Sequence, residues 1–403
     1  MAKTLVWVTH SFRADSRLTS MLSGDCTFVY YSPWHFAGLR ERNIYQNCSI
    51  ENLDAFYFSI NAFNSFLQSK GGKIHVFRES DVVAHINNLV AKHGFTHLVI
   101  DQPQFAFWHS VNLDNIASHV KISKIDSDLV DASCFKMTAK SRWTTHIQHL
   151  NTFKPHAWNP QINAQALQGY SDYVYPAAQQ PDLLNISKIN ARLDQVVYTY
   201  GETRDRHDGQ TRLSTALHNG VIDPANTFFA IANCFKNRGI NPALLDGPAA
   251  AILRQLAFRE ISILQARRHN LTLEDEPIVW AQRLMHIDAY NNMVSIKPNP
   301  TSNVTWQTVS AAKTGDKDLD FLLSELKSTG IMPNRARMWF ASKIFYESHT
   351  GLDALTTLIN TFDLLGLDGQ SPNNYTQCCN ALGLTYGKVL KMNRDNAFKL
   401  LKY

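Results

Sequence analysis

The feature that most constrains the fold of this chain is a change in its hydrophobic pattern part-way along the sequence. Short β-branched runs alternate with longer helical stretches at the start, whereas the last half of the 403 residues is helical almost throughout. Strands that alternate with helices predict a parallel sheet covered by helices, and a succession of helices predicts a helical domain. A chain of this length also exceeds one ordinary core. The sequence therefore predicts an α/β domain followed by an all-α domain.

The predicted α/β domain covers residues 1–130 and is Rossmann-like, with a parallel sheet. Runs with the apolar, β-branched composition of buried strands are TLVWVTH (4–10), CTFVYYS (26–32), KIHVFR (73–78) and THLVIDQ (96–102). Helices are predicted over 49–72 and 80–94, and the second begins with a Ser–Asp cap and ends with His–Gly. No GxGxxG motif follows the first strand, so a dinucleotide fingerprint is absent.

The remainder of the chain divides into a connector and a helical domain. Residues 131–189 form the predicted interdomain connector, because much of this stretch is rich in Pro, Asn and Gln and has little periodicity. Residues 190–403 form the predicted all-helical domain. Its clearest helical patterns lie at 247–270, 318–330, 334–348 and 351–366.

Composition narrows the class of protein. Apolar residues make up 44% of the chain and aromatic residues 11%, which is typical of a folded globular protein. The formal net charge of +5 allows a polyanionic partner without requiring one. The six cysteines are scattered without a CxxC pair, which argues against a zinc or iron–sulfur site and fits a reducing compartment. No stretch approaches the roughly 20 apolar residues of a membrane span. We expect a cytoplasmic monomer without a metal.

Side-chain chemistry alone gives few candidate sites. His146 and His149 are spaced as a metal-binding pair on one helix face could be, but no third ligand lies at a suitable spacing, which favours ordinary histidines. Cys378 and Cys379 are adjacent and are expected to be inert thiols rather than a redox pair. The sequence contains no GxSxG, HExxH or Walker motif.

Two polar clusters within the helical domain remain as candidates. Residues 200–224 include a turn with hydroxyl groups and Arg212 at a helix start, which is typical either of an anion cradle or of a plain capped helix. Residues 328–342 place Asn334 and Arg337 in one helical turn, beside a markedly apolar run. This second cluster is either a solvated face or a buried polar group that needs partners.

These clusters resemble motifs of the photolyase/cryptochrome family. The family's Y-x-x-x-R-D, T-S-R-L-S and G-x-[IL]-S-P motifs are similar to YGETRD (200–205), GQTRLS (209–214) and GVIDP (220–224). Its L-x-W-R-E-F helix resembles QLAFREI (255–261), and its TGWMHNRxRMxxAS motif resembles residues 329–342. Its DGDxxxNNGGWQW motif resembles DGQSPNNYTQCC (368–379), with one residue deleted, and its N-terminal LVWFRxDLR resembles LVWVTHSFR (5–13). The resemblance therefore extends in order over almost the whole chain.

The resemblance implies that the helical domain binds FAD. It places Tyr200 and the turn residues at the phosphates and ribose, and it places polar side chains from three later segments around the rest of the cofactor. An Asn of the 373–374 pair would face the flavin N5, where a carbonyl acceptor favours the reduced ring. The implied cofactor-binding residues are Tyr200, Thr211, Arg212, Leu213, Ser214, Gln255, Arg259, Asn334, Arg337, Asp368 and Asn373 or, given the deletion, Asn374.

The activity implied by the resemblance is electron transfer from light-excited reduced flavin to a pyrimidine dimer in DNA, or flavin photoreduction used as a signal. Phe258, Met338 and Cys379 lie at the implied substrate-binding positions. Single-stranded or already flipped DNA would be the favoured substrate, because extruding a base costs least there. The alternatives are a cryptochrome-like photoreceptor or redox sensor, and a binding protein that has the fold without FAD.

The chain also departs from the family at positions that matter for function. Phe258 replaces the tryptophan that stacks on the flipped dimer, Gln255 replaces a carboxylate, and Pro333 replaces a histidine. The tryptophans of the family's electron-transfer chain and dimer clamp correspond here to Gln377, Cys379, Asn299 and Leu352. After the first strand, Thr9 and Ser11 replace an Arg and an Asp of the family, so the sequence does not indicate which antenna chromophore, if any, the α/β domain binds.

Overall fold

The computed structural model describes most of the N-terminal two thirds of the chain and a shorter part of the remainder. The described residues are 3–31, 50–79, 81–102, 112–134, 136–163, 184–204, 206–244, 246–268, 302–329 and 332–348, with positions 167, 177, 180, 350, 353–354, 356–358 and 361.

The N-terminal part is built on a six-stranded sheet. Its strands are β1 (Lys3–Trp7), β2 (Asp25–Tyr31), β3 (Ile74–Phe77), β4 (His97–Asp101), β5 (Lys121–Ile125) and β6 (Gln161–Ile162). Five of them run in the order β3-β2-β1-β4-β5, and every pairing is parallel. The short β6 pairs with the first residues of β2, Asp25 and Cys26. The predicted parallel α/β sheet is confirmed.

The sheet grows in both directions from β1, with β2 on one side and β4 on the other. In such sheets the loops after the two central strands diverge and leave a crevice at their carboxyl ends. Here the loop after β1 contains His10, Ser11 and Arg13, and β4 ends at Asp101. The carboxyl ends of β1 and β4 therefore carry polar side chains that can contact other parts of the protein.

Four of the strands were predicted from their apolar runs, and β5 and the short β6 were not. Residues of β1 to β4 are almost all buried, as parallel strands covered on both faces must be. β5 lies at an edge and pairs with β4 in the described sheet, and its lysines leave it partly exposed. A strand that is half polar has no clear apolar run to reveal it.

Three helices accompany the sheet in the described N-terminal region: α1 (Arg17–Met21), α3 (Ile50–Ser69) and α4 (Val82–His93). The predicted start and end of α4 are confirmed. The Asp81 side chain accepts a hydrogen bond from Ala84 N, and Gly94 ends the helix in the left-handed conformation at φ 69°.

The helical part contains nine described helices: α5 (Ala139–Gln148), α6 (Ile186–Val196), α7 (Tyr200–Thr203), α8 (Leu213–His218), α9 (Pro224–Asn237), α10 (Pro248–Arg268), α13 (Trp306–Ser310), α14 (Lys317–Thr329) and α15 (Asn334–Glu347). Helices α10, α14 and α15 match their predicted ranges closely. The predicted class, an α/β sheet followed by helices, is therefore confirmed. None of the described helices is long and apolar enough to cross a membrane.

The stretch predicted as a connector, 131–189, contains the helix α5, which the sequence interpretation missed. This helix has few apolar residues, and it is capped by Thr138, whose side chain accepts from Ser141 N. It packs against α10 through Trp143, which is fully buried, and through the polar side chains of Arg142 and His146, which both contact Glu260. A helix anchored mainly by buried charges lacks the apolar period that identifies most helices.

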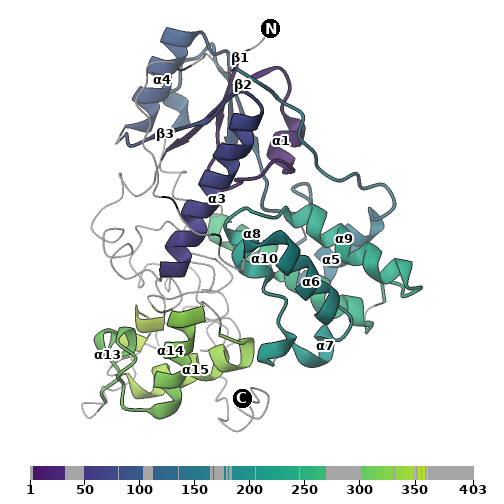
Figure 1. Cartoon of the computed structure of the whole chain (residues 1–403), viewed down its shortest axis with the longest axis vertical. Helices are drawn as coiled ribbons and strands as arrows, with labels where there is room; N and C mark the ends of the chain where they lie inside the picture. The colour runs from purple at the N-terminus through teal and green to yellow at the C-terminus, as the bar shows by residue number, and fades with distance from the viewer. Residues whose placement is uncertain are drawn as a thin grey trace.

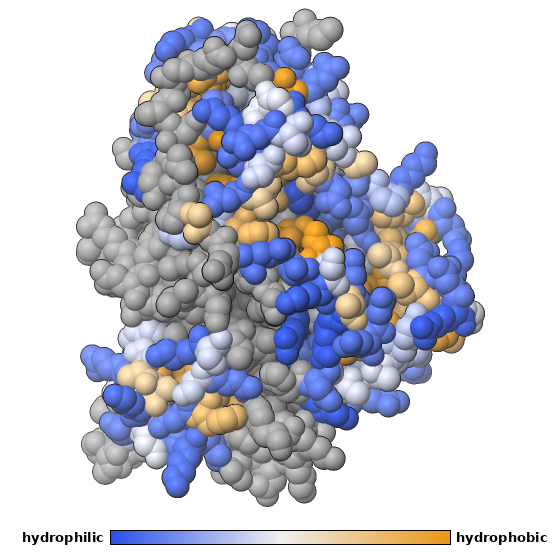
Figure 2. Space-filling view, in the orientation of Figure 1, coloured by the Kyte–Doolittle hydropathy of each residue, from blue (hydrophilic) through white to orange (hydrophobic). Residues whose placement is uncertain are grey.

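Figure 1 shows how these parts are arranged along the molecule. The sheet with α1, α3 and α4 lies at one end, helices α5 to α10 lie together beside it, and α13 to α15 lie together at the opposite end. Figure 2 shows chiefly hydrophilic side chains over the region where α6 and α7 lie.

Candidate functional site

The first polar cluster folds as a tight turn between α7 and α8. Gly209 lies in this turn so close to α7 that a Cβ atom on it would come within 1.9 Å of the Thr203 carbonyl oxygen. Helix α7 in turn packs on α10, where a Cβ on Gly201 would lie 3.3 Å from the Ala251 Cβ. The turn is thus held against the longest helix of the described structure by close backbone contact, which only glycine permits at position 209.

Arg212 is the most unusual residue of this turn. Its backbone is left-handed, with φ 57° and ψ 23°, a conformation that is uncommon and strained for a residue with a long side chain. Its Nε atom is buried and has no hydrogen-bond partner within the described part of the chain. Strain and an unpaired buried donor in one residue are typical of a site built for a ligand.

A second arginine lies beside this turn. Arg192 of α6 donates from Nε to the Gln210 carbonyl oxygen at 2.9 Å, and from Nη2 to the Asp208 carbonyl oxygen. Burial lowers the pKa of Arg192, and the charge of Arg212 lowers it further, against an opposing effect of Asp208. The two guanidinium groups are therefore close enough to repel each other, and the turn carries a positive potential that an anion would relieve.

The sequence-predicted residues on α7, α8 and α10 lie in one part of the fold. Tyr200 and the buried Leu213 share a hydrophobic cluster with the buried residues of α10. Thr211 is half-buried in the turn, and Ser214 is exposed on α8. Gln255 is half-buried on α10. Their roles toward a cofactor stay predictions.

Helix α10 presents two faces of different character. Phe258 is 49% exposed, an unusual position for a large aromatic side chain, and Gln255 lies one turn before it on the same face. The next two residues, Arg259 and Glu260, point into the protein and are buried. Arg259 donates to the Asp128 carbonyl oxygen at 2.8 Å, to Asp128 Oδ1 at 2.9 Å and to the Leu217 carbonyl oxygen at 3.4 Å, so its described contacts tie α10 to the loop at Asp128 and to α8.

The second polar cluster lies on α15, in the other group of helices. Asn334 begins this helix, although its side chain lies outside the described residues. Arg337 is half-buried and donates from Nη2 to the Met332 carbonyl oxygen at 3.2 Å, and Met338 packs against buried apolar residues. Asp368, Asn373, Asn374 and Cys379 lie outside the described residues.

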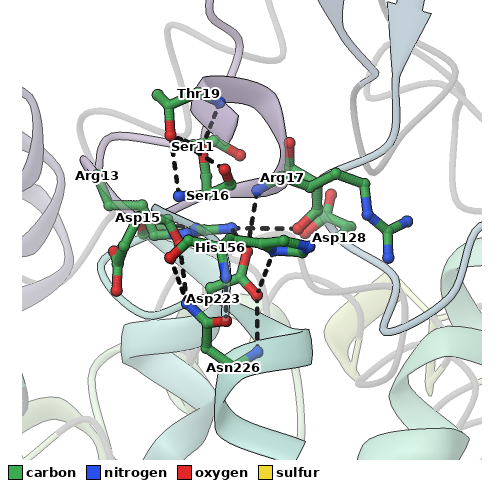
Figure 3. A network of polar contacts seen from close by, with 12 residues as sticks. Ser11, Arg13, Asp15, Ser16, Arg17, Thr19, Asp128, His156, Asp223 and Asn226 are labelled. Atoms are coloured by element: carbon green, nitrogen blue, oxygen red, sulfur yellow. Dashed lines mark hydrogen bonds and ion pairs between the residues drawn. The ribbon is translucent and has the colours of Figure 1, made fainter. Parts of the chain in front are cut away.

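Buried ion pairs, which no motif predicted, join the α/β part to the helices. Asp223 caps α9 by accepting from Asn226 N at 2.9 Å, and it also receives Arg13 Nη2 at 3.2 Å (Figure 3). His156 Nδ1 lies 3.2 Å from its other side. Burial by itself would raise the pKa of Asp223, but His156 and Arg13 outweigh it and lower the pKa to about 2. Asp223 is therefore an anion at neutral pH, held between the two parts of the molecule.

A second group of buried charges lies where the strands β1 and β4 end. His10 Nε2 is 2.6 Å from Asp128 Oδ2, and Asp101 Oδ2 accepts from the backbone N–H groups of His10 and Ser11 at 3.3 and 3.0 Å. Burial opposes the charged form of His10, but Asp101 and Asp128 outweigh it and raise its pKa above the usual value. Asp128 also pairs with Arg259, so α10 is tied to the carboxyl ends of the sheet.

Glu260 forms the third ion-pair group, between α10 and α5. Its Oε2 accepts from Arg142 Nε at 3.0 Å and lies 2.7 Å from His146 Nε2, while its Oε1 accepts from Val130 N. His146, considered from the sequence as a possible metal ligand, is thus a buried partner of Glu260. The described residues contain no group of three His, Cys, Asp or Glu side chains that could hold a metal ion.

The charge of His10 predicts a pH dependence of stability. Because the pKa of His10 is raised in the folded protein, its contribution is fully present below the unfolded value of 6.5 and is lost as the pH rises through the folded pKa. We expect the free energy of unfolding of the wild-type chain to fall as the pH rises above 6.5, and His10→Gln to flatten that fall. Urea unfolding of both proteins across this range measures the difference. Equal slopes would show that His10 is neutral in the folded protein.

Comparison with known proteins gives the fold. No protein-family model and no curated protein matches the sequence. Among solved structures, the chain is similar to a bacterial class III photolyase from Agrobacterium tumefaciens, with a TM-score of 0.57 over 99% of this chain and 96% of that one. It is also similar to the cryptochrome of Synechocystis sp. PCC6803, with a TM-score of 0.63 over 98% of this chain and 85% of that one. The chain has the photolyase/cryptochrome fold.

Sequence identity to these two structures is only 15% and 16%, so the likeness establishes the photolyase/cryptochrome fold and leaves activity open. The resemblance noted from spaced motifs is confirmed at the level of that fold. One matched structure is a photolyase and the other a cryptochrome. The fold alone therefore does not separate repair from light sensing.

Proposed function

We propose that this chain binds FAD in its helical part and uses it for light-driven repair of pyrimidine dimers in DNA, with single-stranded DNA preferred. The observation that carries the proposal is Arg212, whose buried Nε has no partner in the described structure and whose backbone is left-handed. The motif resemblance leads us to expect this turn at the phosphates of FAD. An unpaired guanidinium donor suits a phosphate oxygen, because charged pairs of this kind are the strong hydrogen bonds.

The residues of the turn fit the phosphate end of FAD. Thr211 and Ser214 offer hydroxyl groups that are not fully buried, and Arg212 offers a charged donor. Tyr200, Gln255, Arg259, Asn334 and Arg337, with Asp368 and an Asn of the 373–374 pair, are proposed to hold the rest of the cofactor. When bound in its reduced form, FAD would supply the light-driven electron transfer, and the chain's own share is position and electrostatics.

Phe258 is proposed to contact the DNA lesion. Its ring is half exposed on a helix whose adjacent residues are buried and ion-paired, so the ring is presented on a rigid support. A base stacked on an aromatic side chain gains about 1–3 kcal/mol. Met338 and Cys379 are proposed as further substrate contacts.

We also propose that the protein is a cytoplasmic monomer. Its proposed parts are the α/β domain at 1–130, the connector at 131–189 and the helical domain at 190–403.

Two measurements test this function. The purified protein should show a flavin absorption spectrum, and protein without flavin would contradict both repair and flavin-based sensing. The flavoprotein is then reduced chemically, mixed with dimer-containing DNA and illuminated. Loss of dimers, faster on single-stranded than on double-stranded DNA, is the expected result. Unchanged dimers on both substrates would contradict repair.

Substitutions on the exposed face of α10 should change repair in opposite directions. Phe258→Ala should lower the affinity for dimer-containing DNA about tenfold, because a stacking contact of about 1–3 kcal/mol is removed. Gln255→Glu with Phe258→Trp restores the residue types of the family and should raise the repair rate. Binding by fluorescence anisotropy and dimer loss under light measure the two effects. The control is Phe321→Ala, which truncates a comparably exposed phenylalanine on α14.

A cryptochrome-like photoreceptor or redox sensor is the second candidate function. The observation that favours it is the pairing of Gln255 and Phe258 on the exposed face of α10, where repair enzymes of the family carry a carboxylate and a tryptophan. A sensor should show light-dependent reduction of its flavin, followed by absorbance, while leaving dimers intact. The restored double variant would then still fail to repair.

A further inference from the structure

We propose that Arg192 and Arg212 together form a diphosphate-binding pair, in which Arg192 braces the turn and adds a second positive charge to the ligand site. The motifs of the turn assign Arg212 alone, and Arg192 lies outside them, on α6. The identity of the ligand as the diphosphate of FAD rests on the proposed function. The binding of a diphosphate by the two arginines does not depend on which ligand carries it.

The first argument is the geometry of Arg192. Its guanidinium donates to the carbonyl oxygens of Gln210 and Asp208, the residues just before Thr211 and Arg212, and its Nη1 donates to Gln195 Oε1 at 3.4 Å. Within the turn, His207–Gly209 form a short 3-10 helix, and the bonds from Arg192 hold Asp208 of this helix and Gln210, which restrains the backbone that leads to Arg212. A planar guanidinium can hold two carbonyl groups at once, which a lysine cannot do with the same geometry.

The second argument is electrostatic. Arg192 and Arg212 repel each other across the turn, while the nearby carboxylate of Asp208 is exposed and shared with Arg206. Holding two guanidinium groups together without full compensation costs free energy in the absence of a ligand. A dianion placed between them removes that cost, and a singly charged or neutral ligand removes less of it.

The third argument is the unpaired Nε of Arg212 in the described structure. A buried donor of this kind destabilises the protein unless it is satisfied, and a phosphate oxygen is the acceptor that suits an arginine best. The region of α6 and α7 is chiefly hydrophilic on the visible surface in Figure 2, which suits the approach of a charged ligand.

The test compares Arg192→Gln and Arg192→Lys with the wild type. If the chain purifies with flavin, the rate at which FAD leaves on dilution is followed by flavin fluorescence. If it purifies without flavin, the binding of ADP and of adenosine is measured by isothermal titration. We expect Arg192→Gln to release FAD about tenfold faster, or to bind ADP about tenfold more weakly, with adenosine unchanged. The FAD release rate or ADP affinity of Arg192→Lys should lie between those of the wild type and Arg192→Gln, because lysine keeps the positive charge.

The control is Arg238→Gln, which makes the same charge change on an exposed arginine at the end of α9, whose guanidinium lies 3.7 Å from the centre of the Tyr198 ring. Ligand affinity in wild type should weaken more steeply with added salt than in Arg192→Gln, since a charge has been removed from the site. Circular dichroism and the unfolding midpoint show whether the variants fold. Arg192→Lys that is no better than Arg192→Gln, or an equal effect of Arg238→Gln, would overturn the pair.

The outcomes separate this inference from the proposed function. A chain without flavin that binds ADP through Arg192 supports the pair and contradicts the proposed function. A flavoprotein whose FAD is unaffected by Arg192→Gln contradicts the pair and leaves the proposed function standing. A wild-type chain that holds neither FAD nor ADP overturns both.

Discussion

Replacing Gly220 with alanine should lower the free energy of unfolding by about 2–5 kcal/mol. Gly220 has φ 65°, and a Cβ atom built there would lie 1.8 Å from the His10 carbonyl oxygen and 2.8 Å from its carbon. The left-handed backbone alone costs an alanine about 1–2 kcal/mol. The clash is with backbone, which cannot move aside as a flexible side chain would, and overpacking of this kind adds about 1–3 kcal/mol. Urea unfolding of both proteins measures the change.

The position of Gly220 explains why the effect should be large. This residue lies between α8 and α9, and it touches the loop after β1, which carries His10. Its carbonyl oxygen also accepts from Arg13 Nη1 at 2.9 Å. A displacement there would move the helices away from the sheet and disturb Arg13, which also binds Asp223. We therefore expect Gly220→Ala to weaken the whole junction between the two parts.

Gly239→Ala is the matched control. Gly239 follows α9 in a similar left-handed conformation, with φ 73°, and nothing lies within 4 Å of a Cβ atom placed there. It should cost only the conformational term, about 1–2 kcal/mol. Equal losses from the two substitutions would mean that the close approach at His10 contributes nothing, and would contradict the packing argument.

The sequence predicted those elements whose stability comes from apolar burial. The strands β1 to β4 and the helices α3, α4, α10, α14 and α15 all have runs or periods that burial requires, and all were found near their predicted positions. β5 and α5 were missed because each combines few apolar residues with a specific tertiary neighbour. A hydrophobic pattern in the sequence indicates which residues are buried. β5 is held instead by its pairing with β4, and α5 by the buried pair of Arg142 with Glu260.

The polar network at the domain junction could not be predicted for a related reason. Its partners lie far apart in the sequence: His10 pairs with Asp128, Arg13 with Asp223, and Arg142 with Glu260. A single sequence gives no signal that joins such residues, and each alone resembles an ordinary surface charge. His10, Arg13, Asp223, Arg259 and Glu260 lie within motifs that resemble the photolyase/cryptochrome family, but those motifs do not indicate which residues pair.

The candidate cofactor site was predicted in part. The turn from Gly209 to Ser214 was singled out by its hydroxyls and its arginine, and the structure adds a strained backbone and an unpaired buried donor at Arg212. Arg192 was missed because α6 precedes the motif. Its contacts with the turn are to backbone carbonyl groups, which every residue has, so the residue types of the turn do not reveal them. The part of the site predicted at 368–374 lies outside the described residues.

Helix α10 connects the junction to the proposed substrate face. Phe258 points outward, while Arg259 and Glu260, the next two residues, hold the loop at Asp128 and the helix α5. Because successive helical residues differ by about 100° around the axis, two buried ion pairs beside Phe258 fix the direction in which its ring projects. The rigidity of the exposed face is therefore set by charges buried on the other side.

Glu260→Gln should lower the free energy of unfolding by about 3 kcal/mol at neutral pH. Glu260 and Arg142 are both fully buried, and the substitution leaves the guanidinium without its carboxylate. Removing one partner of a buried ion pair costs about 3–5 kcal/mol, and the retained amide oxygen recovers part of it. Burial opposes the charge of Glu260, but His146 and Arg142 outweigh it and lower its pKa. Its contribution is therefore present above the unfolded pKa and lost as the pH falls toward the folded one.

Urea unfolding at pH 7 and at pH 4 separates this contribution from a general loss of stability. The difference between wild type and Glu260→Gln should be large at pH 7 and smaller at pH 4, whereas Glu79→Gln, at an exposed position, should change the stability by less than about 0.5 kcal/mol at either pH. Adding Arg142→Met to Glu260→Gln should cost less than the sum of the two single changes, because both charges are then gone. Additive losses would show that the two side chains do not form a unit.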